Sequence, residues 1–386
     1  MTQSIGRRLR LGMVGGGRGA FIGGVHRIAA RIDDRYELVA GALASDPQRA
    51  VDSAADLLIP ADRAYETFEK MASAEAARAD GIDVVSIVTP NHVHHAAAKA
   101  FLDVGIHVIC DKPLTTTLDQ ALDLEAAVAK SGRIFALTHN YTGYPMVRQA
   151  REMVAAGALG RIRVVQAEYP QDWLSTKLED SGLKQAEWRT DPARSGPAGC
   201  VGDIGTHAYN LACFISCLKG TEVSADLHTF VDGRRLDDNA HMMLRFDGGA
   251  KGMLWASQVA PGNENALKVR IYGEKGGLEW AQENPNYLTF IPLGEPPRLI
   301  TRGGAGAGDA AAHATRIPPG HPEGYLEGFA QIYTDTAEQI CARIENRDPD
   351  ASALLVPGIA DGVAGVRFIG AAVASSAAGA VWKPLG

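Results

Sequence analysis

The sequence contains little cysteine and lacks the cysteine spacings of metal sites and disulfide frameworks. Its five cysteines (Cys110, Cys200, Cys213, Cys217 and Cys341) are scattered, and no two have CxxC spacing. An odd number of isolated thiols in a chain of 386 residues indicates reduced, buried side chains. Two of them are four residues apart on an expected helix, but no second Cys/His pair has matching spacing. The pattern therefore predicts a cytoplasmic protein and no metal site.

The chain also lacks an excess of positive charge and any long apolar run. Its formal net charge is −7, so electrostatics does not favour a nucleic acid or an anionic membrane as partner. No stretch approaches the roughly 20 apolar residues of a membrane span. The arginines near the start precede a glycine-broken strand and not an apolar signal segment. We therefore expect no nucleic-acid partner, no membrane span and no signal peptide, and a buried helix in the Ala/Gly/Val-rich stretch 359–381.

The pattern of the sequence changes near residue 140. Before this point, short apolar runs such as 9–14 and 82–88 alternate with helical segments, which predicts a doubly wound parallel sheet. From residue 162 onward, seven segments resemble strands joined by short turns, as in a mostly antiparallel, open sheet with one covered face. We predict an α/β domain over 1–140 and an α+β domain over 141–386. The C-terminal helices of the second domain could pack back on the first.

A glycine-rich turn follows the first predicted strand and precedes a helix. Its sequence, Gly15-Gly16-Gly17-Arg18-Gly19-Ala20, fits G-x-G-x-x-[GA] with Gly15, Gly17 and Ala20 at the key positions. Glycine permits a tight turn and lets the backbone approach a pyrophosphate, which then lies at the helix N-terminus. A glycine turn alone is weak support, but here the strand–turn–helix context agrees with it. We predict a Rossmann domain that binds NAD or NADP, with Arg18 also beside the cofactor.

The acid that commonly follows the second strand of such domains is missing. Small residues, including Ser45, stand where a carboxylate would hold the ribose 2′-OH of NAD. Asp46 comes slightly late and is explained as a helix cap before Pro47. Ser45 and Arg49 could instead receive the 2′-phosphate of NADP. The sequence therefore leaves NAD and NADP open.

Polar residues also follow the third predicted strand, at the edge of the sheet where such folds bind ligands. We expect Thr89, Pro90, Asn91 and His94 to lie beside the nicotinamide. His92 and His95 are three residues apart and could share a helix face with His94 between them, but no H-E-x-x-H pattern or nearby carboxylate completes a zinc site. A cofactor-binding turn is the interpretation that fits the sequence.

Two further segments carry candidate catalytic groups. Asp111 and Lys112 follow a strand, where the lysine suits acid–base chemistry or the polarisation of a substrate oxygen, and both residues would border the cofactor. Asp203 and His207 are four residues apart and would share one face of a helix. Histidine suits a general base that takes a hydroxyl proton during hydride transfer, with Asp203 orienting it. Alone, each has a structural explanation, but with the dinucleotide turn they predict the oxidation of an alcohol.

The order of these motifs resembles the glucose–fructose oxidoreductase, inositol dehydrogenase and MocA (Gfo/Idh/MocA) family. The resemblance covers essentially the whole chain and rests on the glycine turn, TPNHVHHAAAKAFLDVGIHVICDKPLTTT, NYTGYPMVRQAREMV and GCVGDIGTHAYN. It implies that Lys112, Asp203 and His207 serve catalysis and substrate binding, and that the open sheet forms a homodimer or homotetramer. The family's Glu-Lys-Pro appears here as Asp-Lys-Pro, and its second acid falls at Asn210.

Several other residues are candidates for contact with the substrate. Tryptophan stacks on sugar rings and arginine donates to hydroxyls, although a packed loop with an ion pair would explain the same residues. The candidates are Asn140, Tyr141, Trp173, Arg189, Asn210 and His321. We predict an NAD(P)-dependent dehydrogenase that oxidises a secondary hydroxyl of a sugar, glycoside or cyclitol. The alternatives are a redox-neutral NAD-dependent glycosidase and a non-catalytic dinucleotide-sensing regulator, which would need neither Lys112 nor His207.

Overall fold

The structure is a computed structural model that describes residues 5–386, and its contacts divide the chain into two compact units. The first unit comprises Met1–Thr115, Asp119–Gly143 and Tyr325–Val363. The second comprises Thr116–Leu118, Tyr144–Gly324 and Ala364–Gly386. The chain therefore leaves the first unit and returns to it for a segment near the C-terminus.

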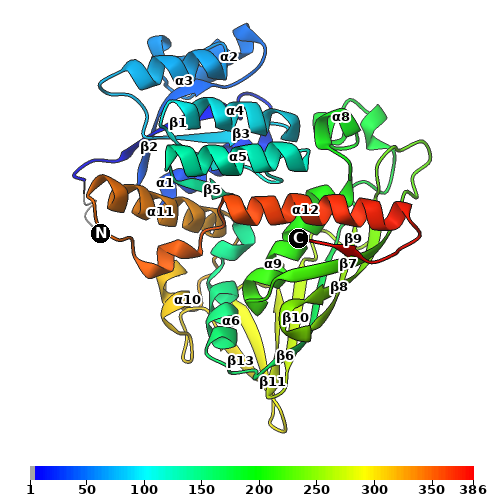
Figure 1. The fold of residues 1–386 in the computed structure, drawn as a ribbon. Coiled ribbons are helices and arrows are strands. Elements are labelled where there is room, and N and C mark those ends of the chain that lie inside the picture. The colour runs from blue at the N-terminus through cyan, green and yellow to red at the C-terminus, as the bar shows by residue number, and fades with distance from the viewer. Residues whose placement is uncertain (1–4) are drawn as a thin grey trace. The chain divides into compact units, whose positions relative to one another are not determined.

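A five-stranded parallel sheet in the order β2-β1-β3-β4-β5 forms the centre of the first unit (Figure 1). All residues of β3, β4 and β5 are buried, as expected for a parallel sheet covered on both faces. The strand order reverses between β1 and β3, and open α/β sheets bind ligands at such a point, beyond the carboxyl ends of the strands. The strands are β1 (Leu9–Gly15), β2 (Tyr36–Ala42), β3 (Val84–Val88), β4 (His107–Cys110) and β5 (Phe135–Leu137).

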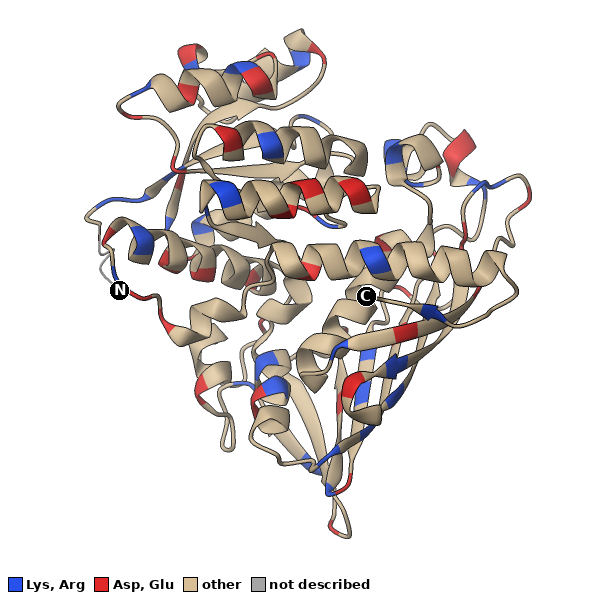
Figure 2. Cartoon of the chain, viewed as in Figure 1, with Lys and Arg blue, Asp and Glu red and all other residues tan. Residues whose placement is uncertain are grey.

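Helices connect these strands, and local sequence starts two of them. The side chains of Asp46 and Thr67 accept hydrogen bonds from the backbone of the first turns of α2 and α3. Charged residues of both signs lie on the visible sides of α4 and α5 (Figure 2). The last helix of the unit comes from the C-terminal segment and packs on α1, with a buried core that also includes β1. The helices are α1 (Phe21–Ile32), α2 (Pro47–Asp56), α3 (Phe68–Ala77), α4 (Asn91–Asp103), α5 (Leu118–Ser131) and α11 (Tyr325–Ile344).

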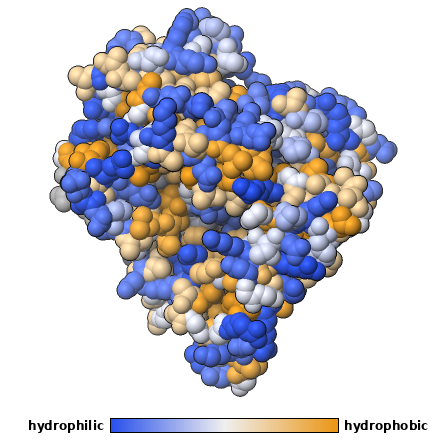
Figure 3. Space-filling model, in the orientation of Figure 1, coloured by the Kyte–Doolittle hydropathy of each residue, from blue (hydrophilic) through white to orange (hydrophobic). Residues whose placement is uncertain are grey.

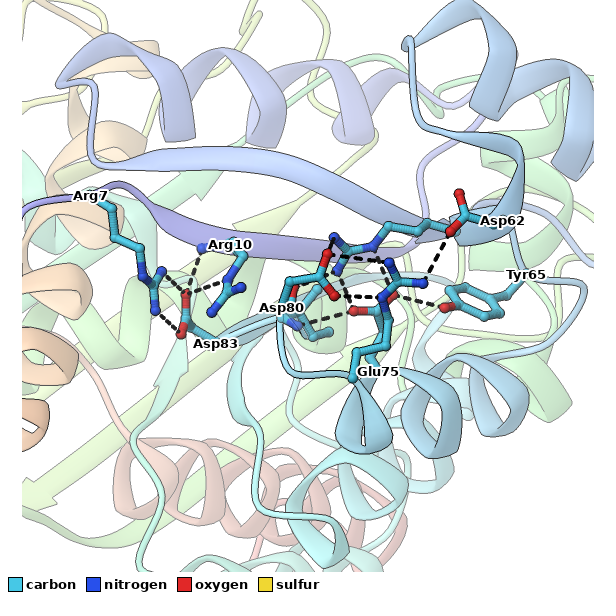
Figure 4. Close-up of polar contacts among 10 residues, drawn as sticks. Arg7, Arg10, Asp62, Tyr65, Glu75, Asp80 and Asp83 are labelled. Carbon is cyan, nitrogen blue, oxygen red and sulfur yellow. Dashed lines mark hydrogen bonds and ion pairs between the residues drawn. The ribbon is translucent and has the colours of Figure 1, made fainter.

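Ion pairs hold the amino-terminal side of this sheet (Figure 4). Asp83, which directly precedes β3, accepts two hydrogen bonds from the Arg7 guanidinium, at 2.6 and 2.8 Å. Glu75 is buried, pairs with the buried Arg63 and accepts a hydrogen bond of 2.8 Å from the Tyr65 hydroxyl. Removing one partner of such a buried pair is costly, so we regard this edge as structural. The opposite side of the sheet, beyond the carboxyl ends of its strands, carries the candidate site of this unit.

The second unit contains a nine-stranded sheet in the order β13-β12-β11-β10-β6-β9-β8-β7-β14. Neighbouring strands are antiparallel except for the parallel pair β6 and β9. The predicted fold class, a parallel doubly wound sheet followed by a mostly antiparallel one, is therefore confirmed. The strands are β6 (Ile162–Pro170), β7 (Gly220–His228), β8 (Asn239–Phe246), β9 (Lys251–Ser257), β10 (Lys268–Gly273), β11 (Gly276–Ala281), β12 (Tyr287–Pro292), β13 (Arg298–Thr301) and β14 (Lys383–Pro384).

Burial alternates along the central strands of this sheet. Strand β9 lies between β6 and β8 in the sheet. Its residues Leu254 and Ala256 are buried, whereas the side chain of Met253 is 54 % exposed. One face is packed against α9, and the other keeps polar and apolar side chains at its surface. The helices of the unit are α6 (Pro145–Ala155), α7 (Lys184–Arg189), α8 (Pro192–Ser195), α9 (Thr206–Ser216) and α10 (Asp309–Ala314).

One helical stretch, Ala351–Ala377, is long and apolar enough to cross a membrane by length and composition alone, and 44 % of its most apolar window is buried. It includes α12 (Ile359–Ala377), where the Phe368 ring stacks on Tyr209 with ring centroids 4.2 Å apart. The Ser375 hydroxyl accepts a hydrogen bond of 2.9 Å from a backbone N–H of β7. These contacts are those of a helix packed in a protein core. On the visible face of the molecule, hydrophobic patches are interrupted by hydrophilic residues (Figure 3).

Candidate active site

The glycine turn after β1 leaves no space for side chains at two of its positions. Gly15 has a φ of +78°, and a Cβ atom on it would lie 2.8 Å from Cγ2 of Thr89. A Cβ atom on Gly17 would lie 2.6 Å from the Ser53 Oγ. The turn leads into the N-terminus of α1, where Ala20 has an extended backbone. A bare backbone turn at a helix N-terminus suits a pyrophosphate, because its oxygens can accept hydrogen bonds from backbone N–H groups.

The end of β2 carries the residues predicted to discriminate NAD from NADP. Ser45 and Arg49 are both exposed. Asp46 accepts a hydrogen bond of 2.8 Å from the backbone N–H of Arg49, so its carboxylate caps α2 as predicted. The guanidinium of Arg18 donates to the Asp56 carboxylate of α2 at 2.7 Å. Arg18 is thus partly neutralised by α2, and the sequence prediction for Ser45 and Arg49 stays open.

The turn after β3 is joined to the turn after β4 by a histidine. Thr89 and Pro90 are half-buried, and α4 begins at the buried Asn91. The fully buried His94 has Nε2 2.9 Å from the Thr89 carbonyl oxygen and Nδ1 2.9 Å from the Pro113 carbonyl oxygen. Burial lowers the pKa of His94, so its neutral ring has one N–H and donates to one of the two carbonyls. The His94 ring therefore lies between two of the turns that the sequence assigned to the cofactor and donates a hydrogen bond to one of them.

The turn after β4 places a fixed carboxylate next to Lys112. One oxygen of Asp111, Oδ1, accepts hydrogen bonds from the Lys112 backbone N–H at 2.9 Å and from the Thr138 hydroxyl at 2.8 Å. Burial alone would raise the pKa of Asp111, but its electrostatic interactions with the His26 ring and the Lys112 ammonium lower it below its ordinary value. The Lys112 side chain is half-buried. The carboxylate is thus charged at neutral pH and holds the backbone that carries the predicted catalytic lysine.

Three residues beyond β5 lie at the same edge of the sheet. His139 is buried, and burial together with the charge of Lys112 lowers its pKa to about 3. Asn140 is 2 % exposed, and its Nδ2 has no hydrogen-bond partner within residues 5–386. Because buried donors in proteins are almost always paired, this amide is a candidate for contact with a ligand. Tyr141 is 4 % exposed. The strand ends of the first unit therefore bring the glycine turn, Lys112 and Asn140 to one edge of one sheet.

In the second unit, the predicted helix around Asp203 begins with a π-helical turn, Val201–Gly205, which continues directly into α9. A carboxylate from outside the segment binds the backbone at the beginning of this π-helical turn. Asp237 accepts hydrogen bonds from the backbone N–H groups of Gly199 at 2.6 Å and of Val201 at 3.0 Å. Burial raises the pKa of Asp237 despite these bonds. The turn at Asp203 is therefore set by a long-range contact as well as by its own sequence.

Asp203 is oriented by two side chains. Its Oδ2 accepts a hydrogen bond of 2.9 Å from the amide of Gln258 and lies 3.2 Å from Nε of Arg189. The Arg189 guanidinium also stacks on the Trp188 ring, with 4.3 Å to its centroid. The side chains of Asp203 and Arg189 keep 15 % and 24 % of their surface exposed. The structure thus brings together two residues that the sequence assigned separately to catalysis and to the substrate.

The first turns of α9 carry the predicted base. His207 is 7 % exposed, and Asn210 is 8 % exposed. The ring of His207 is tilted against that of Tyr169, with ring centroids 6.5 Å apart. The Tyr169 hydroxyl donates a hydrogen bond of 2.7 Å to Asn265. His207 therefore lies beside a tyrosine whose own hydroxyl is held in place.

The remaining candidates lie on loops of the second unit. Trp173, beyond β6, is half-buried. The His321 side chain is exposed, whereas its carbonyl oxygen accepts a hydrogen bond from the buried Arg302, which also pairs with the buried Glu323. The loop is thus fixed while the imidazole is accessible. Contact of either residue with a substrate stays a prediction.

Reasoning from the sequence did not identify three residues that shape the site. Thr138 holds Asp111, Gln258 holds Asp203, and Asp237 holds the π-helical turn. The adjacent acids Asp237 and Asp238, immediately before β8, are a signal for a buried capping carboxylate. Thr138 and Gln258 show no such local signal, and all three residues act on partners distant in the sequence.

Comparison with known proteins agrees with this organisation. Residues 9–139 match the model of the oxidoreductase family with an NAD-binding Rossmann fold, and residues 147–279 match the GFO/IDH/MocA C-terminal domain. The uncharacterised oxidoreductase YfiI of Bacillus subtilis (strain 168) is 37 % identical over 98 % of this chain and 97 % of its own length.

Solved structures match over nearly the whole chain. An oxidoreductase from Sinorhizobium meliloti is 56 % identical, covering 98 % of this chain and 99 % of its own, with a TM-score of 0.89. An inositol dehydrogenase homologue from Azotobacter vinelandii, complexed with NAD+, is 35 % identical, covering 99 % of both chains with a TM-score of 0.94. The same homologue with NADH and myo-inositol has a TM-score of 0.90 over 98 % of both chains.

Proposed function

The chain belongs to the Gfo/Idh/MocA family of NAD(P)-dependent oxidoreductases, and from this premise we propose that it oxidises a secondary hydroxyl of a cyclitol or sugar. The observation that carries the proposal is the arrangement of the first unit, where the side-chain-free glycine turn and Lys112 lie at the same edge of one sheet. The cyclitol class is supported by the similar Azotobacter vinelandii protein, whose structure contains myo-inositol.

The glycine turn would hold the pyrophosphate, and the turns after β3 and β4 would border the nicotinamide. When bound, the nicotinamide would supply an acceptor for the hydride of the alcohol carbon. His207 takes the hydroxyl proton, so that the C–O bond becomes a carbonyl. Lys112, for its part, donates a hydrogen bond to a substrate oxygen and stabilises the negative charge that develops there. Asp203, held by Arg189 and Gln258, orients His207.

A spectrophotometric screen tests this proposal. The purified enzyme is incubated with NAD or NADP and a panel of inositols, aldoses, anhydrosugars and glycosides, and absorbance is followed at about 340 nm, where the reduced nicotinamide absorbs. We expect reduced cofactor to appear with one class of polyol, which also decides between NAD and NADP. No reduction with any substrate, although calorimetry shows that the cofactor binds, would contradict the proposal. Glycoside cleavage without net reduction would indicate the redox-neutral glycosidase instead.

We also propose that the exposed face of the large sheet binds a second copy of the chain. Its central strands present Met243 and Met253, which are 55 % and 54 % exposed, around a hollow of about 380 Å³. Arg270 and Glu168 form an ion pair of 2.9 Å on this face, so it offers both signs of charge to a copy of itself. Apolar groups surrounded by charges of both signs favour a two-fold interface.

Light scattering coupled to size exclusion tests the interface. We expect a dimer or tetramer for the natural chain and dissociation for Met253→Glu, because the variant would bury a new charge at the contact. Leu293→Glu is the matched control, since Leu293 is 77 % exposed and follows β12 in the same unit. A monomeric natural chain, or equal effects of both substitutions, would contradict this interface. We further infer a cytoplasmic enzyme, which is supported by the five cysteines, none of which forms a disulfide within residues 5–386.

A further inference from the structure

A chain of buried polar side chains lies behind the Asp111–Lys112 turn. The Tyr333 hydroxyl of α11 lies 2.8 Å from Nδ1 of His26 on α1 and 2.8 Å from the Ser86 hydroxyl on β3. The Ser86 hydroxyl is also 3.3 Å from the same ring nitrogen of His26. All three residues are at most 1 % exposed. Three elements distant in the sequence therefore contribute to one closed cluster of polar groups.

This cluster reaches the carboxylate that holds Lys112. Nε2 of His26 lies 4.0 Å from Oδ2 of Asp111, while the other carboxylate oxygen accepts the Lys112 backbone N–H. Burial lowers the pKa of His26 to about 4, so the ring is neutral at pH 7 and has a single N–H. The negative charge of Asp111 favours that proton on Nε2. Nδ1 is then an acceptor, and the Tyr333 hydroxyl donates to it.

The cluster does not offer a route for protons to solvent. Its far end, Ser86, is fully buried, and so is Tyr333. A relay needs an exit and an unbroken series of hydrogen bonds. Nε2 of His26 makes no hydrogen bond within residues 5–386 and faces Asp111 through an electrostatic contact at 4.0 Å, so the cluster acts on the carboxylate by charge and packing. The chemistry of the cluster therefore fits positioning and not proton transfer.

We propose that His26 and Tyr333 are positioning residues that fix the Asp111 carboxylate and, through it, the backbone of Lys112. The inference rests on the proposed function for the role of Lys112. A displacement of about 1 Å in a catalytic group can cost up to about 100-fold in rate, so a fixed lysine has a clear benefit. Tyr333 contributes from the C-terminal segment that returns to the first unit.

Tyr333→Phe tests the inference, with Tyr36→Phe as its control. The two phenols are neighbours in one core, with ring centroids 5.3 Å apart, and both are buried. The Tyr36 hydroxyl donates to the Tyr333 backbone carbonyl at 2.6 Å, so its loss removes a buried hydrogen bond without touching the side-chain cluster. Comparable losses of stability are expected for the two variants.

The first readout is amide hydrogen exchange at Lys112, which needs neither cofactor nor substrate. We expect exchange there to rise about tenfold in Tyr333→Phe and to stay within about twofold in Tyr36→Phe, because only the first variant removes a hydrogen bond from the cluster that orients His26 toward Asp111. Equal changes in both variants would overturn the inference. If Tyr333→Phe does not fold, Ser86→Ala replaces it, with an expected rise of about threefold, and no rise at Lys112 in that variant overturns the inference equally.

The second readout is turnover with the substrate found in the 340 nm screen. In Tyr333→Phe we expect kcat to fall about tenfold while KM and the cofactor Kd change less than about threefold, since the substrate contacts themselves are kept. Full kcat in Tyr333→Phe, with Lys112→Ala inactive, would overturn the positioning role alone. Full kcat in Lys112→Ala would instead overturn the proposed function.

Discussion

The two units hold their candidate functional carboxylates in different ways. Asp111 and Asp203 are equally accessible, with 15 % of each side chain exposed. Asp111 is held by uncharged donors, the Lys112 backbone N–H and the Thr138 hydroxyl, with a neutral histidine beyond. Asp203 is held by a guanidinium and an amide, from Arg189 and Gln258. Equal exposure therefore does not imply equal sensitivity to pH or salt.

The contrast extends to the buried groups around each site. Burial lowers the pKa of His26 and of His107 to about 4, and burial together with Lys112 lowers that of His139 to about 3. All three belong to the first unit. In the second unit, burial raises the pKa of the capping Asp237. The stability of the first unit therefore depends on buried histidines that stay neutral. The second unit contains a buried acid whose ionisation costs free energy.

Acidification should have the largest effect, and it should act on the first unit. The three histidines have an ordinary pKa of about 6.5, so the unfolded chain binds protons below that value while the folded unit does not until about pH 4. Their contribution is complete above about pH 6.5 and is lost as the pH falls toward 4. At pH 5.5 we expect a loss of about 1.4 kcal/mol for each histidine and about 4 kcal/mol in total.

Two probes separate the units in this experiment. All five tryptophans lie in the second unit, so their fluorescence reports on it, whereas hydrogen exchange of peptides reports on the first. Urea unfolding is followed by both probes at about pH 8, 6.5 and 5.5. We expect the urea midpoint of the first unit to fall more steeply than that of the second unit as the pH is lowered. Stability of the first unit that is independent of pH over this range would contradict the contrast.

Removing the acid that caps the π-helical turn should have the next largest effect. Asp237→Ala leaves two buried backbone N–H groups, of Gly199 and Val201, without their acceptor, and we expect a loss of about 3 kcal/mol. Asp237→Asn keeps one acceptor and carries no buried charge, so about half that loss is expected. Urea unfolding followed by tryptophan fluorescence measures both. Equal losses for Asn and Ala would show that the charge itself, and not only an acceptor oxygen, stabilises the turn.

The smallest effects come from one matched pair of substitutions. Thr138→Val removes the uncharged donor to Asp111, and Gln258→Leu removes the uncharged donor to Asp203, each at a cost of about 1 kcal/mol. In Gln258→Leu the partly exposed Arg189 is left as the holding partner, and salt screens such pairs. We expect kcat of Gln258→Leu, and not of Thr138→Val, to fall between about 0.05 and 0.5 M NaCl. The same salt dependence of kcat in both variants would contradict the proposed difference between Asp111, which uncharged donors hold, and Asp203, which a guanidinium holds.

Local patterns in the sequence predicted most of the fold of the first unit. Strand–helix alternation and capping residues such as Asp46 act over a few positions, so the order of strands and helices up to β5, except for α3, could be inferred. The sequence allowed a C-terminal helix to pack back on the first domain, but it did not show which contact holds α11 there, because Tyr333 and His26 are far apart in the sequence. The short helices α3 and α10 and the edge strand β13 were also missed.

The candidate site divides in the same way. The motifs at Gly15, Lys112 and Asp203 are local, and the sequence singles them out. The sequence predicted an α-helical face for Asp203 and His207, whereas Asp203 lies in a π-helical turn that Asp237 holds from a distance. Which side chains fix the functional ones is decided by tertiary contacts, so Gln258 and the cluster behind Asp111 became visible only in the structure.

The central claim is that Lys112 acts in an NAD(P)-dependent oxidation and is not merely a surface residue. The most direct test compares Lys112→Ala with Lys99→Ala, a partly exposed lysine of the same unit that pairs with Asp123 on the surface. For each variant, cofactor Kd and kcat are measured with the substrate from the screen. We predict that Lys112→Ala loses at least about 100-fold in kcat and keeps its cofactor Kd, while Lys99→Ala matches the natural chain. Unchanged kcat in Lys112→Ala would contradict the account.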